Sequence, residues 1–152
     1  MKTILIVLGV SAMTAVPAAA EIALGGGDPA AGEKAFKQCQ TCHVVQAADG
    51  TLLAGKAGKT GPNLFGVIGR TAGTYPDFKY GDSMVAAGEK GLAWNEEEFT
   101  KYTKDPSAFL KEFLEDPKAR GKMTFKVKNP DDAHNIWAYF TTLMPAAEAT
   151  GG

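Results

Sequence analysis

The chain has 152 residues, 45% of them hydrophobic and 22% charged, a balance that fits one globular domain and excludes wholesale disorder. Sixteen Lys and Arg against seventeen Asp and Glu give a formal charge of −1, whereas proteins held to nucleic acid by net charge are far more basic. Two cysteines exclude a disulfide-built scaffold, and eighteen glycines with eight prolines predict long loops.

Residues 1–20 have the pattern of a cleaved secretory signal. Lys2 provides a positive start, Thr3 to Val16 is an almost unbroken apolar run, and Pro17 precedes three alanines that end at Ala20. The run is shorter than the roughly 20 residues that span a bilayer. The sequence therefore predicts export to the periplasm with cleavage after Ala20. No later segment is apolar enough for membrane insertion, so we expect the exported protein to be soluble.

Four helices are predicted from N-capping residues, prolines in the first turn and apolar residues at helical spacing. They span about 29–40, 96–105, 106–116 and 130–144. A glycine-rich loop follows the first helix, and Met84 is placed in a short turn. No alternating strand pattern of convincing length is present. We therefore expect an all-α domain at 21–145 and a flexible tail at 146–152.

The chemistry is concentrated in Cys39-Gln40-Thr41-Cys42-His43. Two thiols three positions apart at a helix end can add to the two vinyl groups of a haem, and the adjacent histidine can then supply a nitrogen ligand to the iron. Export agrees with this interpretation, because c-type haem attachment in bacteria takes place outside the cytoplasmic membrane. The motif favours one covalently bound haem c.

Three other interpretations of the two cysteines compete with haem attachment. A redox Cys-x-x-Cys expects a βαβ context, which the sequence does not provide. A zinc site needs four ligands, and beyond the motif the exported chain has only His134 to offer. A structural disulfide requires neither this spacing nor the neighbouring histidine.

The sixth iron position separates a carrier from an enzyme, because a filled position limits the haem mainly to electron transfer and an open one binds small molecules or peroxide. The candidate ligands are Met84, Met123, Met144 and His134. His134 and Met144 fall on the last predicted helix, where packing is the simpler role. Met123 lies in a loop after a proline-terminated helix. Spacing alone leaves the choice open.

Taken together, several motifs of the sequence resemble class I c-type cytochromes, with the bacterial cytochrome c2 and c-550 group as the nearest match. Besides the Cys-x-x-Cys-His motif, they are Thr60-Gly61-Pro62-Asn63-Leu64, Gly69-Arg70, Thr71 to Tyr75, Phe78-Lys79-Tyr80, Trp94, Tyr102, Phe109 to Glu112 and Gly121 to Phe125. The resemblance runs from about Gly27 to Leu143. The loops before Thr60 and between Pro106 and Met123 are longer than in the short mitochondrial type.

The resemblance implies a fold in which the first and last helices cross at Gly32 and long loops surround one covalent haem. It assigns the two thioether bonds to Cys39 and Cys42 and the axial iron ligands to His43 and Met123. Neutral nitrogen and soft thioether ligands in an apolar pocket favour Fe(II) and raise the potential.

Five further positions match family residues around the haem. The resemblance implies that the Pro62 carbonyl accepts a hydrogen bond from the axial histidine. It also implies that Arg70, Tyr80 and Trp94 neutralise or hydrogen-bond the haem propionates, and that the Tyr102 hydroxyl points toward the methionine sulfur. Met84 departs from the family pattern, since many relatives carry a polar residue there.

The near-neutral total charge is the sum of basic segments and an acidic segment. Residues 51–70 and 120–128 contain Lys and Arg and no acid. Residues 95–116 hold seven acids against three lysines, the acids being Glu96, Glu97, Glu98, Asp105, Glu112, Glu115 and Asp116. Both basic segments flank loops expected to contact haem. We therefore predict a positive ring at the haem edge, with Lys59, Lys122 and Lys126 docking acidic partner proteins.

The function implied by the resemblance is that of a monomeric, non-enzymatic one-electron carrier of photosynthesis or respiration. Its expected partners are the cytochrome bc1 complex on one side and a photosynthetic reaction centre or a terminal oxidase or reductase on the other. The alternative is a haem enzyme or gas sensor, such as a peroxidase, with an open sixth position. A nucleic-acid partner is not expected.

Overall fold

In the computed structural model the described residues are 26–144, so the predicted signal at 1–20 and the predicted tail at 146–152 lie outside them. The elements in chain order are α1 (Pro29–Phe36), β1 (Val45–Gln46), β2 (Leu52–Ala54), α2 (Asp82–Glu89), α3 (Glu96–Lys104), α4 (Pro106–Leu114) and α5 (Pro130–Leu143). The expectation of an all-α fold is confirmed, since the described strands amount to one short hairpin.

The four helices predicted from their first residues begin where expected. Asp28 accepts hydrogen bonds from the first backbone N–H groups of α1, and Asn95, Asp105 and Asn129 do the same for α3, α4 and α5. Each cap satisfies an N–H that has no partner inside its helix. Helix α1 ends at Phe36 rather than near residue 40, because the chain then continues in tight turns through residue 42.

Two elements differ from the predictions. The turn expected around Met84 is helix α2, in which Met84 is buried. The N-cap of this helix is Gly81, which has no side chain to accept a hydrogen bond, so the usual sequence signal for a helix start is missing. The antiparallel β1–β2 hairpin was also not predicted, because strands of two and three residues, interrupted by an irregularity, are too short to establish an alternating pattern.

Helices α1 and α5 cross at Gly32, as the resemblance implied. A β-carbon there would overlap the backbone carbonyl of Asn135 and come within 2.8 Å of the Tyr139 β-carbon, so only glycine allows this approach. The aromatic rings of Phe36 and Phe140 meet edge to face beside the crossing, with centroids 5.6 Å apart. Buried aromatic and aliphatic side chains here fasten the two ends of the domain together.

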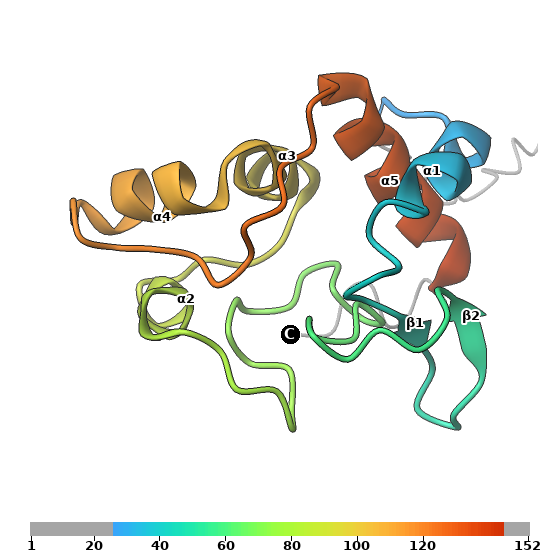
Figure 1. The fold of residues 1–152 in the computed structure, drawn as a ribbon, viewed down its shortest axis with the longest axis horizontal. Helices are drawn as coiled ribbons and strands as arrows, with labels where there is room; N and C mark the ends of the chain where they lie inside the picture. Colours follow the sequence, from blue (N-terminus) through green and yellow to red (C-terminus); the bar gives the residue numbers. More distant parts are fainter. Residues whose placement is uncertain (1–25, 145–152) are drawn as a thin grey trace, which may run out of the picture.

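The helices lie around the outside of the molecule and the long loops occupy its middle (Figure 1). Helices α3 and α4 lie along one side, α2 lies below α4, and the α1–α5 pair with the hairpin forms the other side. A row of aromatic contacts links Trp94 to Tyr102 and Tyr102 to Phe109. This row fixes α3 and α4 relative to the loops in the middle.

Candidate functional site

The Cys-x-x-Cys-His segment directly follows α1. The backbone N–H groups of Cys42 and His43 both donate to the carbonyl oxygen of Cys39, at 3.1 and 2.9 Å, which closes the motif into one compact turn. Both thiols are free and half-buried. The position of this turn follows from the α1–α5 crossing, since Cys39 lies only three residues beyond the end of α1.

The surroundings of the two thiols argue against the competing interpretations. Burial, followed by the proximity of Cys42, raises the pKa of Cys39 to about 12, whereas redox-active Cys-x-x-Cys motifs lower the pKa of their nucleophilic thiol. Within residues 26–144, no group of three or more His, Cys, Asp and Glu side chains is arranged to hold a metal ion. The donor set that a zinc site requires is therefore not assembled in this part of the chain.

His43 is held by the Gly61–Pro62 segment. Its Nδ1 donates a hydrogen bond to the Pro62 carbonyl oxygen at 2.8 Å, the contact expected from the resemblance. The ring lies so close to Gly61 that a β-carbon there would be 2.6 Å from Nδ1. Burial lowers the pKa of His43, which favours the neutral imidazole. With the proton on Nδ1, the Nε2 lone pair is free for a metal.

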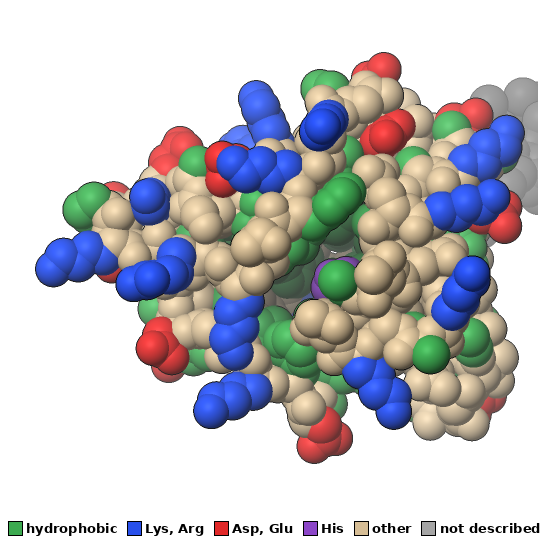
Figure 2. Space-filling model, viewed as in Figure 1, with side chains coloured by type: hydrophobic (Ala, Val, Ile, Leu, Met, Phe, Trp, Pro, Cys, Tyr) green, Lys and Arg blue, Asp and Glu red, His purple; other side chains and the backbone are tan. Residues whose placement is uncertain are grey.

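These residues fit a haem. The face of the molecule shown in Figure 2 is hollowed at its centre, with a histidine side chain at the edge of the hollow and hydrophobic side chains around it. Half-buried thiols, a neutral, half-buried imidazole with a free Nε2, and an apolar hollow are together the donor set and surroundings that covalent haem requires.

Arg70 and Tyr80 lie on the loops in the middle of the fold. The Arg70 guanidinium donates to the carbonyl oxygens of Phe65, at 2.8 Å, and Asn63, at 3.3 Å, and lies over the ring of Tyr75. Burial lowers the pKa of Arg70 and raises that of Tyr80. The Tyr80 ring packs edge to face on Phe78. Contact of either residue with a propionate stays a prediction.

Trp94 and Tyr102 form an edge-to-face pair with ring centroids 5.1 Å apart. Burial is the main cause of a raised pKa of Tyr102, so its hydroxyl stays protonated and able to donate a hydrogen bond. Trp94 is 9% exposed. Tyr102 lies on α3 and Trp94 on the loop that precedes it, so the pair joins this helix to the loop. Their predicted contacts with a propionate and with the methionine sulfur stay predictions.

Met123 is half-buried on the segment between α4 and α5. In Figure 1 this segment and the one that follows α1 run on opposite sides of the middle of the fold. Two serine hydroxyls accept hydrogen bonds from this segment: Ser83 from the Arg120 N–H and Ser107 from the Gly121 N–H, each at 3.1 Å. The segment is thereby attached to both α2 and α4 just before Met123. Sequence reasoning missed the two serines, because a serine in the first turn of a helix gives no sign of a distant partner.

The three lysines predicted to dock partners are all exposed, and two of them also make contacts within the chain. The Lys122 amine donates to the Lys79 carbonyl oxygen at 2.8 Å, and Lys126 pairs with Asp105 at 2.6 Å. Lys and Arg side chains surround the hollow in Figure 2 and outnumber the acids on that face. The pairing with Asp105 reduces the free charge that Lys126 contributes.

The other candidate ligands lie elsewhere. His134 pairs with Glu96 at 2.7 Å and links α5 to α3, and Met144 is buried at the end of α5. Both positions agree with the packing roles preferred from the sequence.

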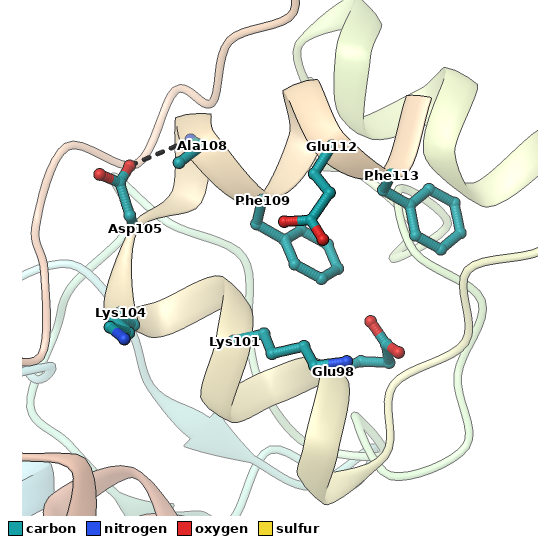
Figure 3. A pocket seen from close by; sticks show the side chains of 8 residues that line it. All are labelled: Glu98, Lys101, Lys104, Asp105, Ala108, Phe109, Glu112 and Phe113. Carbon is teal, nitrogen blue, oxygen red and sulfur yellow. Dashed lines mark hydrogen bonds between the residues drawn. The ribbon is translucent and has the colours of Figure 1, made fainter. Parts of the chain in front are cut away.

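A second hollow lies between α3 and α4, where Phe109 and Phe113 project from α4 toward α3 (Figure 3). Around these rings lie charges of both signs, including Glu98, Lys101 and Glu112. The hollow contains none of the predicted haem-site residues. Its mixed charges and lack of thiol or imidazole groups give it no role in holding a haem.

The chain is similar to several bacterial cytochromes c. Over 131 residues it is 60% identical to cytochrome c2 of Cereibacter sphaeroides, covering 86% of this chain and 88% of that protein. It is 44% identical over 140 residues to cytochrome c-550 of Paracoccus denitrificans, covering 90% and 85%. The solved structure of cytochrome c2 from Rhodobacter sphaeroides superposes with a TM-score of 0.75, at 63% identity, over 76% of this chain and 95% of that one. A scan against protein-family models finds no match.

Fold, motif and these similarities together place the chain in the class I c-type cytochromes, to which it belongs. Within this class the similarity is to the cytochromes c2 and c-550 in particular. As a member of the class the chain carries one covalent haem c and serves electron transport. No helix among residues 26–144 is long and apolar enough to cross a membrane.

Proposed function

We propose that the chain is a soluble periplasmic one-electron carrier whose haem is attached through Cys39 and Cys42 and ligated by His43 and Met123. In this proposal it passes electrons from a cytochrome bc1 complex to a photosynthetic reaction centre or a terminal oxidase or reductase. The observation that carries the proposal is the geometry of His43: a neutral, half-buried imidazole with its Nδ1 bonded to Pro62 and its Nε2 free.

The haem supplies a one-electron Fe(II)/Fe(III) couple when bound. The residues of the chain hold the proposed ligands in place and limit the access of water to the site. Gly61 and Pro62 fix the His43 ring, Ser83 and Ser107 fix the segment that presents Met123, and the buried aromatic row keeps water from one side of the site. No residue in this arrangement is needed to make or break a bond in a substrate, which supports a carrier rather than an enzyme.

The proposal is tested by electron-transfer kinetics with purified membrane complexes. The haem-loaded protein is expected to be reduced by a bc1 complex and reoxidised by a reaction centre or an oxidase at rates that fall with salt. Failure to accept electrons from any bc1 complex, with the protein intact by its visible spectrum, would overturn the assignment of the donor.

Electrostatic steering by the three lysines gives a separate prediction. Replacing Lys59, Lys122 and Lys126 with glutamine is expected to slow association with an acidic redox partner about tenfold at low ionic strength, and much less at high salt. Stopped-flow rate constants at several salt concentrations measure the effect.

The matched control removes three lysines from the acid-rich region instead: Lys101→Gln, Lys104→Gln and Lys111→Gln. This variant changes the net charge equally but leaves Lys59, Lys122 and Lys126 in place. Equal slowing in both triple variants would mean that net charge, and not a local docking surface, determines the rate.

A further inference from the structure

Asn63 uses its entire side-chain amide to tie the loop that contains Pro62 to its surroundings. Its Oδ1 accepts hydrogen bonds from the backbone N–H groups of Gln46, at 3.0 Å, and Phe65, at 2.9 Å. Its Nδ2 donates to the Gln46 carbonyl oxygen, at 2.7 Å, and to the Tyr75 hydroxyl, at 3.1 Å. These four bonds use both N–H donors and both oxygen lone pairs, which is the full capacity of an amide.

The backbone of Gln46 determines which side chain can occupy this position. An N–H and a C=O of the same residue face Asn63, so the side chain must present an acceptor and a donor side by side, and the orientation of the amide is thereby fixed. A carboxylate would turn an oxygen toward the Gln46 carbonyl oxygen. An apolar side chain would leave both backbone groups without this partner.

Two backbone hydrogen bonds also join the loop that contains Pro62 to the residues on either side of His43. The Gly61 N–H donates to the Cys42 carbonyl oxygen, and the Leu64 N–H donates to the Val44 carbonyl oxygen, both at 2.8 Å. Residues 61–64 therefore run beside residues 42–46. Two side chains also bond across this pair of segments: His43, through its bond to the Pro62 carbonyl oxygen, and Asn63. The bonds of Asn63 are the ones that a substitution can remove without replacing the proposed iron ligand.

Arg70 and Tyr75 also contact the loop that contains Pro62. The Arg70 guanidinium donates to the carbonyl oxygens of Asn63 and Phe65, and its carbon lies 4.9 Å from the centre of the Tyr75 ring. The Tyr75 hydroxyl in turn accepts from Asn63. The three side chains form one connected polar cluster, in which Asn63 contacts both this loop and β1.

We propose that Asn63 is the positioning residue for His43, acting through the Pro62 carbonyl, with Arg70 and Tyr75 as its supports. The proposal rests on the proposed role of His43 as an iron ligand. The hydrogen bond at Nδ1 fixes the orientation of the imidazole and raises the basicity of Nε2. Loosening the loop that contains Pro62 lengthens the bond between His43 Nδ1 and the Pro62 carbonyl oxygen. Nε2 then becomes a weaker electron donor to the iron, which favours Fe(II) over Fe(III).

The test compares three variants of the haem-loaded protein. Asn63→Ala is expected to speed the hydrogen exchange of the His43 Nδ1–H, followed by NMR, about tenfold, and to shift the reduction potential upward. Asn63→Asp keeps the two bonds accepted from backbone N–H groups but sets a carboxylate oxygen against the Gln46 carbonyl oxygen, so its exchange rate is expected to rise less than that of Asn63→Ala. Only the exchange rate is compared for this variant, because the added negative charge by itself favours Fe(III). Tyr75→Phe removes one bond and is expected to show the smallest change.

Asn129→Ala is the matched control, since Asn129 also accepts a backbone hydrogen bond, from Asp131 at 3.2 Å, but at the start of α5. It is expected to cost stability without moving the exchange rate or the potential. Asn63→Ala behaving like this control in both readouts would overturn the positioning role and leave the proposed function intact. If Asn63→Ala does not load haem, Tyr75→Phe decides by both criteria and Asn63→Asp by the exchange rate. A wild-type protein in which His43 does not ligate the iron would overturn the proposed function, and this role with it.

Discussion

Gly61→Ala is expected to yield little haem-loaded protein and to destabilise what is obtained by about 3 kcal/mol, the upper part of the usual range for overpacking. The added β-carbon would lie 2.6 Å from the His43 Nδ1 and 2.7 Å from Nε2, so either the ring or the loop must move. Movement of the ring breaks its bond to Pro62, and movement of the loop breaks the backbone bond from Gly61 to Cys42. Denaturant unfolding followed by the haem absorption measures the loss.

Gly26→Ala is the matched control, because a β-carbon there meets nothing within 4 Å. It tests the general cost of replacing glycine with alanine in this chain, and it is expected to leave both yield and unfolding unchanged within about 0.5 kcal/mol. An unfolding midpoint for Gly61→Ala equal to that of the control would show that the His43 ring is not confined by this loop.

Met123→Ala is expected to turn the carrier into a protein with an open iron position. The reduced variant should bind carbon monoxide readily, with an affinity at least about tenfold above that of the wild type, and its potential should fall because the soft sulfur that favours Fe(II) is gone. Optical titration with carbon monoxide and a redox titration measure the two effects.

Met84→Ala separates loss of a ligand from loss of packing. Met84 is buried in α2, so its truncation is expected to cost about 2 kcal/mol or more of stability without opening the iron to carbon monoxide. Wild-type protein that binds carbon monoxide as readily as Met123→Ala would instead favour the alternative of a haem enzyme or gas sensor with an open position.

Much of the helical framework could be predicted because local chemistry determines where these helices start. Asp28, Asn95, Asp105 and Asn129 each cap a helix with their own side chain, and that signal is readable without knowing the fold. Helix α2 has no such cap and begins after Gly81, so Met84 was assigned to a turn. Helix α2 is stabilised by packing against α4 instead, and that tertiary contact cannot be recognised in the sequence.

The functional site likewise has a part that could be predicted from the sequence and a part that could not. The cofactor could be predicted from five adjacent residues, because covalent haem attachment requires a fixed local spacing of thiols and imidazole. The supports of the ligands could not, because they are made by residues distant in sequence: Asn63 reaches Gln46, and Ser83 and Ser107 reach the segment before Met123. Their polar side chains resemble ordinary loop and helix-surface residues until the fold brings their partners to them.

The crossing of α1 and α5 at Gly32 has a consequence for how the family can vary in length. Because this contact joins the two ends of the domain, the chain between them is a closed loop, and extra residues in it cost little entropy: about 0.6 kcal/mol for each doubling of a flexible loop. The long connections before Thr60 and ahead of Met123 can therefore lengthen or shorten in evolution, while the one glycine at the crossing has no acceptable replacement.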